Sequence, residues 1–251
     1  MRRLLLTLRY DGTNYHGWQV QKNACTVQQT LQDAAEAVLG ARPGITGCSR
    51  TDAGVHAEMF CAHLDTASAI PCERLPAALN AHLPRDIAVY GCREVAPDFH
   101  ARYACRGKTY RYQFYNGAVR NPFYEGRALH VHAPLDADLL ARAAGGFTGT
   151  HDFRGFCAAG SSVEDTVRTV PRAAVTREGE LVVFRVTADG FLYNMVRIMA
   201  GTLLAVAAGE LAPQEVAAVV ASGDRLRAGK TAPAYGLYLE RVYYDLDKEG
   251  R

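Results

Sequence analysis

The sequence predicts an α+β fold. Segments with the alternating apolar pattern of strands are mixed with segments that have the spacing of amphipathic helices, and the two kinds do not alternate regularly. The chain has 251 residues, of which 49% are hydrophobic and 22% are charged, as expected for a globular protein with one large domain or two modest ones. These observations favour α+β over a parallel sheet built from strand–helix–strand units.

The first part of the chain begins with a strand and a helix. A strand is expected over residues 3–10, because leucines recur there at every second position. The polar connection 11–26 contains Trp18, the only tryptophan, and loops this long are uncommon unless they are functional. Thr26 begins a helix with a capping box, and Gly40 ends it. Further elements are expected at 44–48 (strand), 59–64 (strand), 73–81 (helix), 87–95 (strand) and 108–115 (strand).

The second part of the chain shows the same mixture. Helices are expected at 135–145, 194–208 and 213–222, and strands at 167–176, 181–188 and 237–244. The mostly apolar stretch 195–209 is too short to span a membrane and is interrupted by Gly201, so a buried helix is the better interpretation. We therefore expect no membrane partner.

The start of the sequence and the cysteines indicate the cellular compartment in which the protein is expected. No charged and then apolar leader with a small-residue cleavage site is present, so secretion is not expected. The seven cysteines are an odd number and include no C-x-x-C pair. Because this pattern fits reduced thiols better than a disulfide framework, we expect a cytoplasmic protein.

Residues 99–124 combine basic and aromatic side chains and contain no acidic residue. This composition is typical of a surface for single-stranded or looped RNA. Alternating tyrosine and arginine are equally typical of a half-exposed strand, so both interpretations stay open. The residues concerned are Arg102, Arg106, Lys108, Arg111 and Arg120, with Tyr103, Tyr110, Tyr112, Phe114 and Tyr115.

Asp52 lies between two of the predicted strands, in the run RTDAGVH at residues 50–56. An aspartate in a turn ordinarily bonds its own backbone. Loops carried on a rigid sheet are, however, where catalytic groups are usually held. The position of Asp52 alone does not decide between these two interpretations.

Five segments in chain order resemble the tRNA pseudouridine synthase A family (TruA). They extend from Tyr10 to Leu239, and only Ser49 departs from the glycine or alanine more often expected before the RTD run. The segments are 10–19 (YDGTNYHGWQ), 50–56 (RTDAGVH), 99–112 (with FHAR and KTYRY), 191–197 (FLYNMVR) and 236–239 (GLYL).

The resemblance implies two similar α+β halves, 1–104 and 105–251, which share a long mixed, mainly antiparallel sheet with the active-site cleft between them. It implies an isomerase that converts uridine to pseudouridine at positions 38, 39 and 40 of the tRNA anticodon stem-loop. The alternative is a pseudouridine synthase that acts on another structured RNA. The implied partners are tRNA and a second copy of the chain in a homodimer, without DNA.

The resemblance also implies roles for individual residues. Asp52 is the expected nucleophile, and Tyr110 is expected to stack on the target base. Arg50 is suited to fill the place that the base vacates, and Leu237 supplies an apolar wall. Arg102 and Lys108 are candidate RNA contacts within the basic segment.

Arg197 is the only charged residue between Phe191 and Gly209. A buried arginine needs a counter-ion, and a carboxylate nucleophile in a dry site needs a cation. Arg197 is therefore a candidate catalytic partner of Asp52. The alternative is that Arg197 lies on the exposed stripe of its helix.

No cofactor or metal is expected. The isomerisation oxidises nothing, and the sequence contains neither of the glycine-rich motifs that bind nucleotides. His130 and His132 lack a third ligand nearby, so we expect them to be structural or surface residues and not metal ligands. We expect the same of Cys61 and His63. Two other function classes are a glycoside hydrolase with Glu58 as the second carboxylate, and a non-catalytic RNA-binding module.

Overall fold

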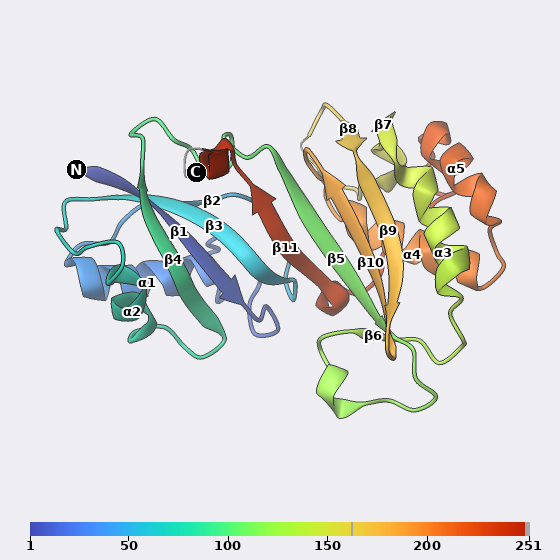
Figure 1. Cartoon of the computed structure of the whole chain (residues 1–251), viewed down its shortest axis with the longest axis horizontal. Helices are drawn as coiled ribbons and strands as arrows, with labels where there is room; N and C mark the ends of the chain where they lie inside the picture. The colour runs from blue at the N-terminus through green and yellow to red at the C-terminus, as the bar shows by residue number, and fades with distance from the viewer. Residues whose placement is uncertain (162, 249–251) are drawn as a thin grey trace. The chain divides into compact units, whose positions relative to one another are not determined.

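The computed structural model describes residues 1–161 and 163–248. Its contacts divide the chain into two compact units, each with its own strands and helices (Figure 1). The first unit contains Met1–Arg106 and the chain from Leu239 onward, and the second contains Gly107–Tyr238. The mixture of strands and helices confirms the α+β class.

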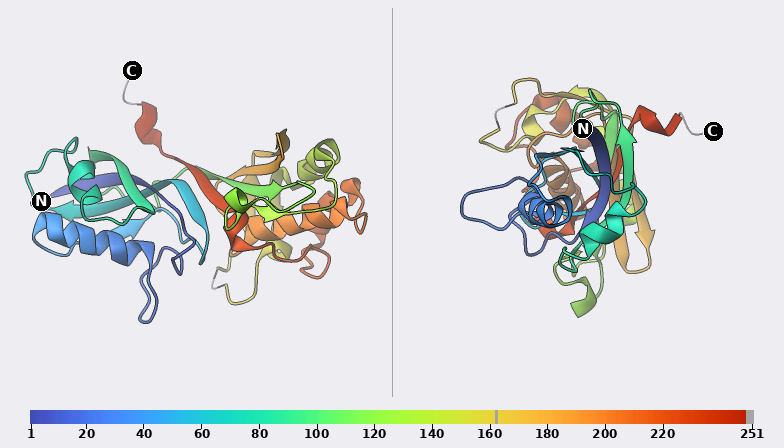
Figure 2. Two further views of the ribbon diagram at one scale, coloured as in Figure 1. Left: turned by 90° about the horizontal axis from the view of Figure 1, so that it is seen from below. Right: turned by 90° about the vertical axis from the view of Figure 1, so that its left-hand side faces the viewer.

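The first unit is built on the strand order β4-β1-β3, with antiparallel pairing on both sides of β1. The buried side chains of β1 and of helix α1, which lies alongside the strands (Figure 2), form its core. The short strand β2 pairs with β3. The elements are β1 (Arg2–Tyr10), α1 (Val27–Leu39), β2 (Ile45–Gly47), β3 (His56–Thr66), α2 (Leu75–Asn80) and β4 (Ile87–Val95).

Helix α1 begins and ends at the predicted residues. The Thr26 side chain accepts a hydrogen bond from the Gln29 N–H at 3.4 Å. Gly40 ends the helix with a left-handed φ of 76° and donates its N–H to the Glu36 carbonyl. Both terminal signals were local, which is why the sequence alone placed them.

The second unit is built on the strand order β5-β10-β9, with β6 parallel to β5. Helix α3 contacts β9 and α4, and α5 contacts the small sheet of β7 and β8. The elements are β5 (Gly107–Tyr115), β6 (Leu129–His130), α3 (Ala137–Ala144), β7 (Gly149–Asp152), β8 (Val167–Val170), β9 (Arg172–Glu178), β10 (Leu181–Ala188), α4 (Met195–Ala207) and α5 (Val216–Ser222).

The last strand, β11 (Leu237–Tyr243), completes the sheet order β4-β1-β3-β11-β5-β10-β9. The antiparallel pairs and the single parallel pair of β5 with β6 confirm the large, mixed, mainly antiparallel sheet. The expected cleft between the two halves stays a prediction.

The C-terminal end of the chain differs from the predicted halves, 1–104 and 105–251. From Leu239 onward the chain clusters with the first unit. The Arg106 N–H donates to the Tyr243 carbonyl at 2.9 Å, and the Tyr244 hydroxyl donates to the Ala101 carbonyl at 2.6 Å. These bonds join segments far apart in sequence, so a boundary drawn along the chain does not include them.

Two other predicted elements differ in detail. The predicted strand 167–176 is two strands, β8 and β9, which separate at Pro171 and pair with different partners. Proline lacks an N–H for the ladder and favours such a break. The predicted helix 213–222 begins with a 3₁₀ turn at Pro213–Glu215, and the short strands β6 and β7 were not predicted.

Candidate functional site

Asp52 is half-buried on the loop between β2 and β3. The loop turns tightly, because the Val55 N–H donates to the Asp52 carbonyl at 3.2 Å and Gly54 has a φ of 76°. The neighbouring Thr51 is buried, and its hydroxyl lies 2.8 Å from the Tyr10 hydroxyl at the end of β1. The turn around Asp52 is thus fixed to the sheet.

A second loop, residues 11–18, holds the Asp52 loop through main-chain contacts. The Trp18 N–H donates to the Thr51 carbonyl at 3.1 Å, and the Gly54 N–H donates to the Tyr15 carbonyl at 3.2 Å. None of these bonds uses the Asp52 carboxylate. The polar connection 11–26, predicted to be functional, therefore positions the predicted nucleophile.

Glycine makes this close approach possible at two positions. A Cβ on Gly17, whose φ is 80°, would lie 2.3 Å from the Thr51 carbonyl oxygen. A Cβ on Gly12 would lie 2.0 Å from the Val55 carbonyl oxygen. Since no side chain fits at these distances, the glycines of the motif at 10–19 are explained by contact with the Asp52 loop.

Asp86 and His56 brace the second loop. The buried Tyr15 hydroxyl donates to Asp86 Oδ1 at 2.7 Å, and burial together with this carboxylate raises the Tyr15 pKa. His56 is 2% exposed, and its Nδ1 accepts the Gly12 N–H at 3.0 Å. His56 also lies 3.1 Å from Asp11 Oδ1. His56 thus orders residues 11–12 against the strand that follows the Asp52 loop.

Arg197 is half-buried on helix α4 and is fixed there by hydrogen bonds. Its Nε donates to the Ala232 carbonyl at 2.8 Å, and its Nη1 donates to Asn194 Oδ1 at 2.6 Å. The Ala232 N–H donates back to the Arg197 carbonyl at 3.1 Å. A side chain bonded in this way is not part of a solvated helix stripe, so the exposed-stripe alternative is wrong.

Asn194 reaches this position through an unusual backbone conformation. Its φ is 60°. Among residues 1–161 and 163–248, no other residue except glycine has a positive φ. Asparagine tolerates the left-handed region better than most residues do, at a cost in local strain. The residue before α4 therefore turns its amide oxygen toward the Arg197 guanidinium.

Tyr110 is only 6% exposed on β5, and its ring meets Phe191 edge-on at a centroid distance of 4.9 Å. Leu237, at the start of β11, is also 6% exposed. Tyr112 is fully buried, its hydroxyl donates to the Pro233 carbonyl at 2.8 Å, and burial raises its pKa. Tyr112 is thus a core residue, and the choice of Tyr110 by motif stays a prediction.

Three aromatic residues of β5, Tyr112, Phe114 and Tyr115, belong to the core. Tyr112 and Phe114 are 0% exposed, and Tyr115 is 4% exposed. These three rings therefore face the core, whereas Lys108 and Tyr110 on the same strand stay predicted RNA contacts. Tyr103 differs, because it is 78% exposed and precedes the strand.

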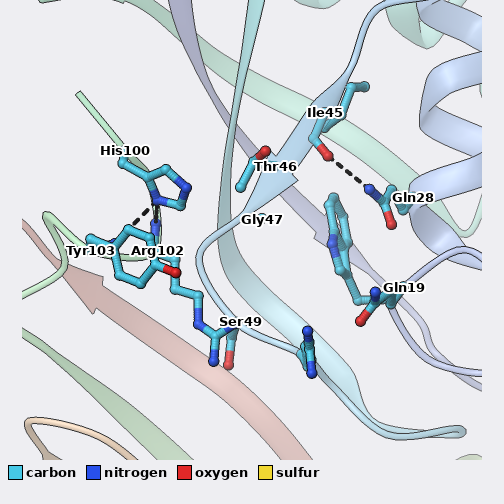
Figure 3. Close-up of a pocket in the computed structure, with 11 residues that line it drawn as sticks. Gln19, Gln28, Ile45, Thr46, Gly47, Ser49, His100, Arg102 and Tyr103 are labelled. Carbon is cyan, nitrogen blue, oxygen red and sulfur yellow. Dashed lines mark hydrogen bonds between the residues drawn. The ribbon is translucent and has the colours of Figure 1, made fainter. Parts of the chain in front are cut away.

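Arg50 and Arg102 line one pocket of about 280 Å³ in the first unit (Figure 3). Arg50 comes from the Asp52 loop and Arg102 from the segment after β4. The structure therefore brings two of the predicted RNA-contact residues to one place, and one of them, Arg50, precedes Asp52 by two residues. Lys108 is half-buried on β5 in the second unit and does not line this pocket.

Comparison with known proteins identifies the family. The family model described as tRNA pseudouridine synthase matches residues 7–104 and 143–245, which is most of the chain. This chain belongs to the tRNA pseudouridine synthase family. The match includes the Asp52 loop and helix α4 with Arg197, and it confirms the resemblance and the isomerase class.

Close relatives extend over the full chain. The tRNA pseudouridine synthase A of Ruminiclostridium cellulolyticum is 48% identical over 245 residues, which cover 97% of this chain and 100% of the relative. That of Moorella thermoacetica is 49% identical over 243 residues, covering 96% and 99%. The match to a solved structure, "Crystal Structure of a Cbf5-Nop10-Gar1 Complex", covers 94% of this chain and 57% of that one, at 14% identity and a TM-score of 0.39.

The predicted residues of this family member fall into two groups. Asp52, Arg50 and Arg102 belong to the first unit, whereas Tyr110, Lys108, Arg197 and Leu237 belong to the second. The pairing of Asp52 with Arg197, which would join the units, stays a prediction. Sequence reasoning missed Tyr15 and Asp86 as supports, because their contact connects segments 71 residues apart.

Potential metal ligands do not gather in the described part of the chain. Within residues 1–161 and 163–248, no three His, Cys, Asp or Glu side chains are placed to hold an ion. His130 Nε2 lies 2.9 Å from the Gly117 carbonyl oxygen, and His132 Nδ1 lies 2.8 Å from that of Ala118. His63 Nδ1 accepts the Ala101 N–H at 3.1 Å. No helix of the described chain is long and apolar enough to cross a membrane.

Proposed function

We propose that this chain isomerises uridine to pseudouridine at positions 38, 39 and 40 of the tRNA anticodon stem-loop, with Asp52 as the nucleophile. Family membership supports the reaction class and tRNA as the substrate. The observation that carries the choice of Asp52 is its loop, which main-chain bonds from Tyr15 and Trp18 and the Tyr10–Thr51 contact hold in place.

The reaction needs an anionic group at the junction of sugar and base. The bond from N1 of uracil to C1′ of ribose breaks, the base turns over, and a new bond forms between C5 and C1′ while the C5 proton leaves. Carboxylates act as covalent nucleophiles at comparable sugar centres. A rigid loop helps, because catalysis by positioning is sensitive to displacements of about 1 Å.

The other candidate residues receive supporting roles. The target base must leave its helix, and Arg50 is placed beside Asp52 in sequence to occupy the vacated position. Tyr110, backed by Phe191, offers a fixed ring for the base, and Leu237 an apolar wall. Arg197 carries the positive charge that keeps Asp52 ionised.

The remaining parts of the proposal concern partners and location. The isomerisation transfers no electrons to another molecule, so the reaction needs no redox cofactor. We propose a cytoplasmic homodimer with tRNA as its substrate. Arg102 and Lys108 contact the RNA backbone in this proposal, through phosphate oxygens.

Release of tritium from tRNA labelled at uridine C5 tests the proposal. Asp52→Asn should abolish release and leave tRNA affinity within a few-fold, because affinity rests on many phosphate contacts. Glu58→Gln is the matched control: this exposed carboxylate lies six residues away, and its loss should leave release unchanged. Release by Asp52→Asn at a near wild-type rate would remove Asp52 as nucleophile.

The target positions in the tRNA need a separate experiment. Labelled tRNA in which cytidine replaces the uridines at positions 38, 39 and 40 should release no tritium. Continued release at the wild-type rate would assign the activity to other uridines. Loss of release in the Glu58→Gln variant would show that the isomerisation needs a second carboxylate, whereas free labelled uracil in place of tritium release would indicate glycoside hydrolysis.

A further inference from the structure

The pocket that contains Arg50 and Arg102 has the electrostatic character of a phosphate site. None of its eleven lining residues is acidic. Neither guanidinium forms an ion pair with any residue that the structure describes. Two exposed arginines without acidic partners attract phosphate groups, and the planar guanidinium suits phosphate oxygens.

One side of the pocket presents a fixed aromatic ring. Tyr103 is 78% exposed and stacks on His100, with ring centroids 4.2 Å apart and an interplanar angle of 29°. His100 is itself held, because its Nδ1 accepts the N–H groups of Arg102 at 3.2 Å and of Tyr103 at 3.3 Å. An exposed ring in a fixed orientation is a platform on which a nucleobase stacks.

The opposite side of the pocket is rigid. Trp18 is 3% exposed and stacks on Phe60 at 4.1 Å, and a Cβ on Gly47 would lie 2.6 Å from the indole. Gln28 is bonded at both ends of its amide: Nε2 donates to the Ile45 carbonyl at 2.7 Å (Figure 3), and Oε1 accepts the Val20 N–H at 2.9 Å. A preformed wall reduces the entropy lost when a ligand binds.

The pocket is small and close to the predicted nucleophile. Its volume of about 280 Å³ is just below the range for small-molecule sites, roughly 300–1,000 Å³, so it has room for a single nucleotide and no more. Arg50 lines it and precedes Asp52 by two residues, so their Cα atoms are at most about 7 Å apart. An occupant of the pocket is therefore near any group that Asp52 attacks.

We infer that this pocket binds one nucleotide of the tRNA next to the target uridine. Its base stacks on Tyr103 and its phosphate contacts Arg50 and Arg102. The inference rests on the proposed function for the identity of the RNA. The fixed stacking ring, the acid-free lining and the position beside the Asp52 loop carry it.

Trp18 allows a direct test, because it is the only tryptophan of the chain and lies in the pocket wall. Titration of the full-length protein with unmodified tRNA should change its intrinsic emission saturably, in the wild type and in Asp52→Asn. Tyr103→Ala should weaken tRNA affinity by about 5- to 150-fold, the range for loss of one stacked base. Tyr103→Phe should keep the affinity, since stacking needs the ring and not the hydroxyl.

Tyr90→Ala is the matched control, because Tyr90 is also an exposed tyrosine of the first unit and does not line the pocket. Its tRNA affinity should equal that of the wild type. If Tyr103→Ala binds tRNA as tightly as the wild type, or if saturating tRNA leaves the Trp18 emission unchanged, the pocket is not a nucleotide site.

Failure of the inference and failure of the proposed function give different results. A wild-type protein that releases no tritium but shows a Tyr103-dependent binding and emission change removes the proposed function and leaves the pocket as an RNA site. Normal tritium release together with unchanged binding in Tyr103→Ala removes the pocket and leaves the function.

Discussion

The two units hold their candidate charged residues by different means. In the first unit the Asp52 loop is held through main-chain atoms of Tyr15 and Trp18, at distances that require glycine at position 17. In the second unit Arg197 is held through its own guanidinium, which donates to Ala232 and Asn194. One unit positions a loop, and the other positions a side chain.

The difference matches what each residue is proposed to do. A nucleophile must stay in place for attack, and the main-chain bonds around the Asp52 loop provide that support. A counter-ion needs only to keep its charge in place, so its hydrogen-bond donors can be used by the protein. The predictions that follow test whether these two kinds of support can be separated.

Gly17→Ala should have the largest effect. The left-handed backbone alone costs roughly 1–2 kcal/mol with a Cβ, and this Cβ would meet the Thr51 carbonyl oxygen at 2.3 Å. Displacement of the Asp52 loop by about 1 Å should lower the rate of tritium release on the order of 100-fold. Thermal unfolding and the release assay measure the two effects.

Gly40→Ala is the control for this experiment. Gly40 has nearly the same φ, 76°, but a Cβ there meets nothing within 4 Å. It should show the same backbone cost of roughly 1–2 kcal/mol without loss of activity. Equal activity in the two variants would show that the close approach of residues 11–18 does not position Asp52.

Arg197→Met should have the next largest effect. Loss of the cation disfavours ionised Asp52, so its pKa should rise and the acidic limb of the pH–rate profile should move upward. If the pair is fully dry, the stranded charge costs roughly 3–5 kcal/mol. Arg197→Lys should retain more activity than Met, because it keeps the charge but loses the two-donor geometry.

Stability must be measured on the same variants. Arg197→Met also leaves the Ala232 and Asn194 oxygens without this donor, which costs about 1–3 kcal/mol for each buried group. A purely structural role would lower the unfolding temperature without moving the acidic limb. That result would leave Arg50 as the next candidate counter-charge for Asp52.

The comparison also shows which features the sequence could predict. Helix α1 was placed by Thr26 and Gly40, because caps act within one turn of the chain. The roles of Asp52 and Tyr110 were predicted from matches to family motifs, and no physical property of the sequence selected these two residues. The contacts of Gly17 with the Asp52 loop could not be predicted, since they depend on how distant segments meet.

The basic and aromatic segment shows the same limit. Composition predicted RNA contact and a half-exposed strand equally well, and burial then separated Tyr112 and Phe114 from Tyr103. The pocket of Arg50 and Arg102 joins segments about 50 residues apart in the sequence. Residue types identified the chemistry, but only the fold brought the residues together.

Salt dependence should separate the basic residues by smaller effects. Arg102→Ala and Lys108→Ala should each make the slope of log affinity against log salt shallower by about one unit, if each contacts a phosphate. Arg106→Ala should change the slope less, because its Nε already lies 2.7 Å from Asp245 Oδ2. Exposed Arg142 on α3 is the control, and its loss should leave the slope unchanged. If every variant has the same slope as the wild type, residues 99–124 face away from RNA.

Acid stability should show the smallest difference between the units. In the first unit the hydrogen bonds of Arg3, at 2.7 and 2.8 Å, lower the pKa of Asp65. In the second unit the hydrogen bonds of Arg154 and then of Thr166 lower the pKa of Asp152 from 3.8 to about 2. A lowered folded-state pKa contributes stability that is present above the unfolded value near 3.8 and is lost as the pH falls toward the folded value.

Asp65→Asn and Asp152→Asn should therefore each lower the Tm at pH 7 by no more than about 2–4 °C, since exposed ion pairs contribute little. Asp152→Asn should lower the Tm by less than the lowered pKa of Asp152 suggests. Arg154 is 68% exposed and only two residues away, so the same pair can form in the unfolded chain. Arg3 and Asp65 lie opposite each other on β1 and β3, 62 residues apart, and meet only when the sheet forms. Thermal unfolding between pH 2 and pH 7 measures both, and a larger loss at pH 7 for Asp152→Asn than for Asp65→Asn would show that the local pair stabilises the fold more than the cross-strand pair.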